Sequence, residues 1–188
     1  MRNLYFLAVA GITVFAFLGC ATGESMTKAG INFAQYKRVA ILPFEYRTRN
    51  NQISVEDYFE QELMGKGYNI VERIKIESML KELQFQQSDL TDQDKTAQIG
   101  KFLNVDALLS GVVSISSSRD DINVDISVKL TSVEDASILW SGSGSTEGGG
   151  VLGGIIGGIG KGLVQDTKVS TEVKGVVKKI CKKFPSSK

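Results

Sequence analysis

Closely spaced acidic residues are the first feature of this sequence that could do chemistry. Glu56, Asp57 and Glu60 fall in a segment with helical spacing, where carboxylates could act as general acid and base or bind calcium. The simpler interpretation is a solvated helix face, since charged side chains commonly line the outer side of an amphipathic helix. The chain contains no histidine, which removes Ser-His-Asp and Cys-His catalysis and the commonest metal ligand. We therefore expect no catalytic residues, no cofactor and no metal site.

A phosphate-binding loop is the second kind of chemistry to consider, because Gly160-Lys161 lies in a glycine-rich segment. The phosphate-loop motif needs glycine at position 155 and serine or threonine at position 162. The chain has Ile155 and Gly162 there. The motif fails at both positions, so the sequence does not predict a nucleotide site.

Cys20 carries the clearest chemical prediction. It ends an apolar run from Leu4 to Leu18, follows the small residue Gly19, and has one basic residue, Arg2, ahead of the run. This arrangement is typical of a secretory signal, and a cysteine at the cut site looks like a lipobox, in which the thiol receives diacylglycerol. A plain cleaved signal and an uncleaved anchor are the alternatives, although the run is shorter than the roughly 20 residues that span a bilayer. The sequence predicts a signal peptide over residues 1–19 and membrane attachment through Cys20.

Charge and cysteine content exclude two further classes of protein. The formal net charge is +1, without the basic excess of a nucleic-acid-binding surface, so we expect no nucleic acid partner. If Cys20 is lipidated, Cys181 is the only other cysteine, so no disulfide forms within the chain. Cys181 lies beside the apolar stripe of a predicted helix, which favours its burial.

Hydrophobic periodicity predicts an α/β fold with a mixed sheet (α+β in composition). Residues 20–36 are small and polar and read as a linker, and residues 37–188 form one domain. The strands are expected at residues 39–44, 68–72, 105–115, 122–131 and 138–145. The helices are expected at residues 54–65, 76–83, 91–103 and 169–180. The resulting element order is β-α-β-α-α-β-β-β-α.

A glycine-rich loop over residues 147–162 separates the last strand from the last helix. It has no helical or strand periodicity, so one interpretation is a mobile connection. Branched apolar residues are unusual in a solvated linker, so the other interpretation is a loop that contacts membrane or a protein partner. Its contact residues would be Val151, Leu152, Ile155, Ile156 and Ile159. The last helix carries lysines at positions 174, 178, 179, 182 and 183. They could form a surface for membrane or nucleic acid, and the simpler interpretation is that those in the last turns complement the helix dipole.

Several ordered motifs resemble the CsgG-like lipoproteins, the family of the curli-secretion channel protein. They are Val39-Ala40-Ile41-Leu42-Pro43-Phe44, Val71-Glu72-Arg73, Met79-Leu80-Lys81-Glu82-Leu83, Ile99 to Ala107 followed by Gly111, and Ile138-Leu139-Trp140-Ser141-Gly142. The last motif is also similar to LpoB, the lipoprotein activator of a peptidoglycan synthase. The resemblance implies a domain related to the TolB N-terminal and anticodon-binding α/β fold.

The chain departs from the curli channel where that protein inserts its membrane hairpins. The link between the strands ending at Ile115 and starting at Ile122 is far shorter than a spanning hairpin requires. We therefore expect a non-enzymatic envelope lipoprotein, a scaffold or secretion-accessory component that acts through protein contacts. Its partner would be another envelope protein or, in a homo-oligomer, another copy of the chain. Two alternatives stay open: a subunit of an oligomeric curli-type export channel, and an LpoB-like activator. Ala21 after the lipid-bearing cysteine suggests the outer membrane, facing the periplasm.

Overall fold

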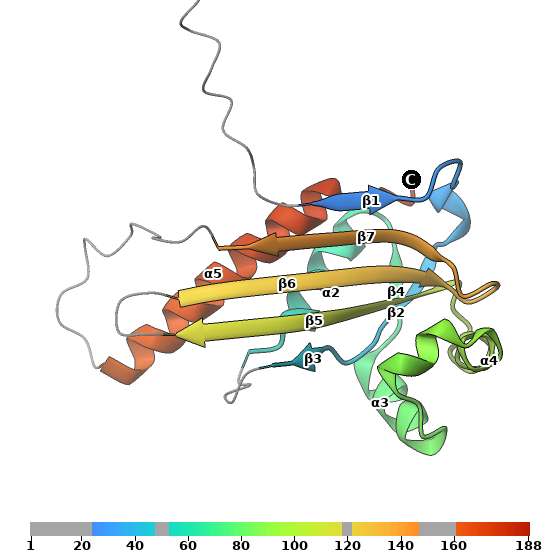
Figure 1. The fold of residues 1–188 in the computed structure, drawn as a ribbon, viewed down its shortest axis with the longest axis horizontal. Coiled ribbons are helices and arrows are strands. Elements are labelled where there is room, and N and C mark those ends of the chain that lie inside the picture. The colour runs from blue at the N-terminus through green and yellow to red at the C-terminus, as the bar shows by residue number, and fades with distance from the viewer. Residues whose placement is uncertain (1–23, 48–52, 118–121, 147–160) are drawn as a thin grey trace, which may run out of the picture.

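A seven-stranded mixed sheet organises the protein (Figure 1). The computed structural model describes residues 24–47, 53–117, 122–146 and 161–188. The strand order is β1-β7-β6-β5-β2-β4, and β3 pairs with β5 beyond the end of β2. The strands are β1 (Ser25–Thr27), β2 (Arg38–Ile41), β3 (Glu45–Tyr46), β4 (Asn69–Ile70), β5 (Ala107–Ser117), β6 (Ile122–Ser132) and β7 (Ile138–Ser145).

The sheet changes from parallel to antiparallel at β5. β2 runs parallel to both β4 and β5, because helical segments connect these strands, whereas β5, β6, β7 and β1 are antiparallel neighbours. The predicted mixed α/β fold and its element order are confirmed, with the first predicted strand divided into β2 and β3. Pro43 lies between the two, and because proline has no N–H it offers no donor to a ladder at this position.

Helices cover the two faces of the sheet unequally. The helices are α2 (Val55–Gly65), α3 (Arg73–Glu82), α4 (Gln93–Leu103) and α5 (Lys161–Lys183), with short 3-10 helices η1 (Phe33–Gln35) and η2 (Gln87–Thr91). α2 and α5 pack on one face and enclose the larger core, which includes Phe59, Trp140 and Val177. α3 and α4 cover only one end of the opposite face, over Ala40 and Leu108 of the smaller core.

The alternation predicted for β6 is confirmed residue by residue. Val124, Ile126, Val128 and Leu130 are buried, while the residues between them are exposed. The alternation arises because successive side chains of a strand point to opposite faces of the sheet. The face opposite α5 is uncovered over most of β6, so Asn123, Asp125, Ser127 and Lys129 are exposed, whereas Thr131 near the end of the strand is buried.

The sequence predicts a linker over residues 20–36, but part of this segment belongs to the fold. Ser25–Thr27 forms β1 and pairs antiparallel with β7, and Phe33 of η1 joins the larger core. The ordered fold therefore begins at least as early as Glu24 rather than at residue 37. The segment looks like a linker in sequence because a three-residue strand is too short to show alternation.

Three details of the helices concern two helix starts and one exposed aromatic side chain. α4 is capped by Asp92, whose carboxylate accepts the backbone N–H groups of Asp94 and Lys95, so the helix starts after Asp92 rather than at Thr91. Phe102, an aromatic residue of α4, is 55% exposed. α5 begins at Lys161, so the last two residues of the predicted glycine-rich loop belong to the helix.

Candidate interaction surface

The uncovered part of the sheet is the most distinctive surface of the protein. Beyond Leu108, no described helix covers the α3/α4 side of β5, β6 and β7 (Figure 1). Two rows of side chains cross the three strands there, Ser110–Lys129–Ser141 and Val112–Ser127–Ser143. Most of these side chains are small and hydroxyl-bearing, so a partner can come close to the sheet. We call this surface the open sheet face.

A shallow hollow of about 490 Å³ lies over the open sheet face. Leu90 and Thr91 of η2 line it on one side, and Met26 of β1 lines it on the other. Met26 is 76% exposed and Ile138, which also lines the hollow, is 49% exposed. A polar floor with large apolar side chains at its rim is suited to a protein contact, because exposed apolar groups gain most from leaving water.

The carboxylates of α2 differ in their surroundings. Glu56 is buried and its carboxylate accepts the backbone N–H of Phe44 at 2.8 Å and the hydroxyl of Tyr46 at 2.6 Å. The interpretation of a solvated helix face is therefore wrong for Glu56 and correct for the exposed Asp57 and Glu60. Glu56 ties the β2–β3 segment to the start of α2, which is a structural role. Among the described residues, no group of histidine, cysteine, aspartate or glutamate is arranged to hold a metal ion.

The thiol of Cys181 is buried in the larger core, as predicted. Burial away from water raises its pKa to about 12, so at neutral pH the group is a protonated thiol with little nucleophilic character. Cys181 therefore acts as a small apolar side chain between α5 and the sheet.

The remaining predicted site residues lie outside the described part of the chain. These are Cys20 and the apolar residues of the glycine-rich loop, Val151, Leu152, Ile155, Ile156 and Ile159. Their roles stay predictions. None of the helices in the described ranges combines the length and the apolar character that crossing a membrane requires.

The hollow was not predicted from the sequence. Its floor residues alternate in β6 and β7, so their shared orientation could be predicted. Its rim could not, because Met26 comes from a strand too short to recognise and Leu90 from an irregular turn.

The fold and the open sheet face together describe a mixed α/β domain that presents a surface for contact. Residues 51–146 match the family model of the peptidoglycan-synthase activator LpoB, from before α2 to the end of β7. The match spans half of the chain, and the chain belongs to this family. It supports the LpoB part of the resemblance noted in the sequence and gives no support to the CsgG-like part. No curated protein matches the sequence.

Two solved structures with a TM-score of 0.50 share this fold at low sequence identity. The PelC dodecamer from Paraburkholderia phytofirmans is 16% identical, with 84% of this chain and 97% of that chain covered and a TM-score of 0.50. The lipoprotein GNA1162 from Neisseria meningitidis is 18% identical, with 79% and 99% covered and a TM-score of 0.50. The C-terminal domain of LpoB from Escherichia coli is 15% identical, with 64% and 87% covered and a TM-score of 0.45. Likeness at this level of identity concerns the fold alone.

Proposed function

We propose that this protein is a non-enzymatic lipoprotein of the cell envelope that activates a peptidoglycan synthase by direct contact. The observation that carries the proposal is the family match over residues 51–146. The absence of histidine from the whole sequence agrees with a regulatory rather than a catalytic role.

The open sheet face is the proposed contact surface for the synthase. Its three strands lie within or at the end of the matched segment, and its rim offers Met26 and Ile138 as apolar anchors. Lys129 lies on the middle strand, β6, in the Ser110–Lys129–Ser141 row, and supplies one positive charge that could orient the partner. Large exposed side chains around a flat polar floor correspond to the anchors and adaptable contacts of protein interfaces.

In this proposal Cys20 is lipidated and holds the protein at the outer membrane, facing the periplasm. Residues 1–19 are the removed signal, and a short segment from Cys20 to β1 joins the lipid to a single domain. Mass spectrometry of membrane-extracted protein should find an acylated Cys20 at the mature N-terminus. A mature N-terminus elsewhere, or a Cys20→Ala variant that stays membrane-bound at high salt, would contradict the lipid anchor.

The glycine-rich loop is proposed as a second contact element for membrane, synthase or another copy of the chain. Changing its five branched apolar residues to serine should leave the melting temperature nearly unchanged and weaken association. A variant that unfolds would place the loop in the core. One that folds and associates normally would make the loop a simple connection.

Reconstitution tests the activator function directly. A peptidoglycan synthase from the same organism should polymerise or crosslink glycan strands faster in the presence of this protein. Ser127→Trp fills the floor of the open sheet face and should abolish the stimulation. Ser78→Trp, on the exposed side of α3, is the matched control and should leave it intact.

The outcomes of this experiment separate the candidate functions. If both variants still stimulate the synthase, the surface that contacts the synthase is not the open sheet face. No binding and no stimulation with any synthase of the organism would contradict the activator function. Conductance of the purified protein in lipid bilayers would instead favour the export-channel alternative.

A further inference from the structure

The solvent side of α5 is strongly basic. Between residues 167 and 183 the exposed lysines are Lys168, Lys174, Lys178, Lys179, Lys182 and Lys183. Glu172, partly buried, is the one acidic residue of this stretch. The opposite side of the helix packs into the larger core through residues such as Val173 and Val177. Because the whole chain carries a net charge of only +1, the lysines form a local concentration of positive charge.

The helix dipole accounts for only part of this charge. A lysine stabilises a helix C-terminus when it lies in the last turn, which in α5 contains Lys182 and Lys183. Lys168 and Lys174 lie more than two turns before the end of the helix at Lys183, beyond the range of that effect. The basic surface therefore extends further along α5 than helix stability requires.

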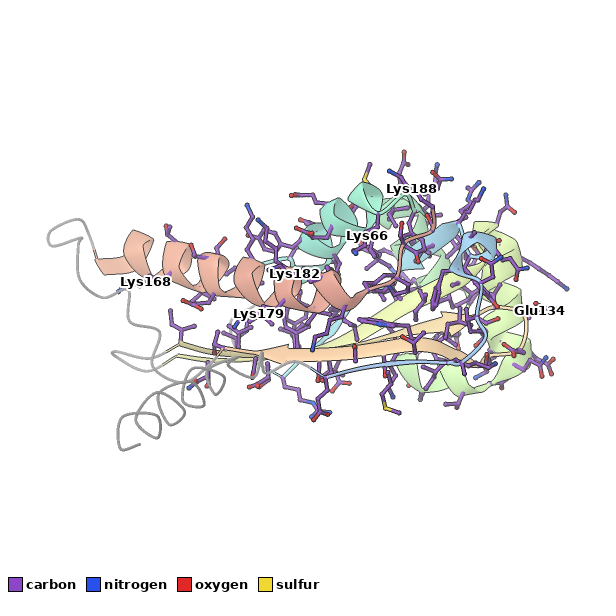
Figure 2. The ribbon with its side chains drawn as sticks, turned by 90° about the horizontal axis from the view of Figure 1, so that it is seen from above. Lys66, Glu134, Lys168, Lys179, Lys182 and Lys188 are labelled. Atoms are coloured by element: carbon purple, nitrogen blue, oxygen red, sulfur yellow. The ribbon has the colours of Figure 1, made fainter. Side chains whose placement is uncertain are left out.

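The lysines of α5 and the edge strand β1, where the chain enters the fold, can be compared in a single view. Figure 2 looks down on the β1 edge of the sheet, and Lys168, Lys179 and Lys182 are visible along α5 in that view. The chain enters the fold at this edge, since the carbonyl of Glu24 accepts the backbone N–H of Ser143 at 2.9 Å. The entry of the polypeptide and the lysines thus belong to one side of the molecule.

The distance between Glu24 and the proposed lipid anchor is short. This step rests on the proposed function, in which Cys20 carries the lipid. An extended chain covers at most about 3.6 Å per residue, so Glu24 lies within roughly 14 Å of Cys20. Electrostatic attraction to a charged membrane extends over a screening length of about 8 to 10 Å. The domain is therefore held within reach of the lipid headgroups.

We propose that the basic side of α5 docks the domain onto an anionic bilayer surface. Anionic headgroups complement the lysines, and the tether from β1 brings them together. Each lysine near such a surface strengthens membrane partition about fivefold, so Lys168, Lys179 and Lys182 together contribute on the order of 100-fold. Because α5 lies on the opposite side of the sheet from the open sheet face, docking leaves that face free for a protein partner.

Lysine footprinting of the full lipidated protein tests the docking. The protein is reconstituted on vesicles of phosphatidylcholine alone or mixed with phosphatidylglycerol, then acetylated and analysed by mass spectrometry. Lys168, Lys179 and Lys182 should lose reactivity severalfold on the mixed vesicles, and high salt should restore it. Exposed lysines of α3 and α4, Lys81 and Lys101, are the controls and should react equally on both. Equal reactivity of the α5 lysines on both vesicles would overturn the proposal.

A second measurement separates docking from lipidation. The mature protein carrying Cys20→Ser, with residues 1–19 removed, should still sediment with the mixed vesicles at low salt. Adding Lys168→Glu, Lys179→Glu and Lys182→Glu should reduce its partition on the order of 100-fold. Adding Lys81→Glu and Lys101→Glu should change it little. Two outcomes separate the docking proposal from the lipid-anchor proposal. If Cys20 is acylated but the α5 lysines keep their reactivity on the mixed vesicles, the lipid anchor stands and the docking is refuted. Salt-sensitive binding by Cys20→Ser protein with no acylation of the native chain would refute the anchor instead.

Discussion

The ring of Phe184 lies against the indole of Trp140, with ring centroids 4.4 Å apart and planes inclined by 55°. Phe184 follows the end of α5, and its other side meets the ring of Tyr68 edge-on at 5.5 Å. The carbonyl of Phe184 also accepts the ammonium of Lys66 at 2.8 Å. The C-terminal end of the chain thus closes the larger core between β7 and the segment after α2.

Phe184→Ala should lower the free energy of unfolding by about 3–5 kcal/mol, because it leaves a cavity between two aromatic rings. Chemical denaturation monitored by the fluorescence of Trp140 measures the change. Phe102→Ala is the control, since Phe102 is 55% exposed, and should cost about 0.5 kcal/mol or less. Equal effects of the two changes would contradict the packing described for Phe184.

Gly142→Ala should destabilise the protein by about 1–3 kcal/mol through overpacking. A Cβ at this position would overlap the Trp140 ring, which is itself buried. Gly175→Ala on the exposed side of α5 meets no atom within 4 Å and should be neutral or stabilising, since alanine favours a helix. Thermal melts of both variants give the comparison, and a neutral Gly142→Ala would show that the Trp140 ring can shift.

Glu56→Ala should cost about 1–3 kcal/mol, because it leaves the buried N–H of Phe44 without its acceptor. Glu56→Gln keeps an oxygen for that N–H and should cost less. Urea denaturation of both variants measures the difference. If the two substitutions cost the same, the charge of Glu56 rather than its hydrogen bonds would be responsible.

Acid should release the contact between the start of the fold and the β6–β7 turn. Hydrogen bonds from the hydroxyl and then the backbone N–H of Ser137, with the nearby charge of Lys28, lower the pKa of Asp135 to about 2. A lowered pKa means that the carboxylate contributes stability above its ordinary pKa of 3.8, and that this contribution is lost as the pH falls through about 2. Hydrogen exchange of Met26 and Lys28 should rise over that window, and Asp135→Asn should remove the pH dependence.

Cys181 should resist thiol reagents while the protein is folded. In the Cys20→Ser variant it is the only thiol, and its burial and raised pKa of about 12 leave almost no thiolate at neutral pH. Iodoacetamide should modify it only after denaturant is added. Rapid labelling of the native protein would show that the packing of α5 opens readily.

Local periodicity in the sequence determined the elements and their order. The alternation of β6 and the helical spacing of α3 and α5 could be recognised because each repeats over several residues. The burial of Cys181 could be predicted for the same reason, since it lies beside a stripe of buried residues. The absence of histidine was enough to exclude the common catalytic arrangements.

Only the tertiary structure decided which faces of the helices and strands are covered and which distant segments pack against them. Ser25–Thr27 has no pattern of its own and becomes a strand only because β7 offers an edge for pairing. Glu56 resembles a solvated helix residue until the β2–β3 segment brings the N–H of Phe44 and the hydroxyl of Tyr46 to it. Periodicity reports the burial of a residue within its own element, whereas pairing and coverage depend on segments distant in the chain. The open sheet face, its rim and the side of α5 shared with β1 belong to that second kind of information.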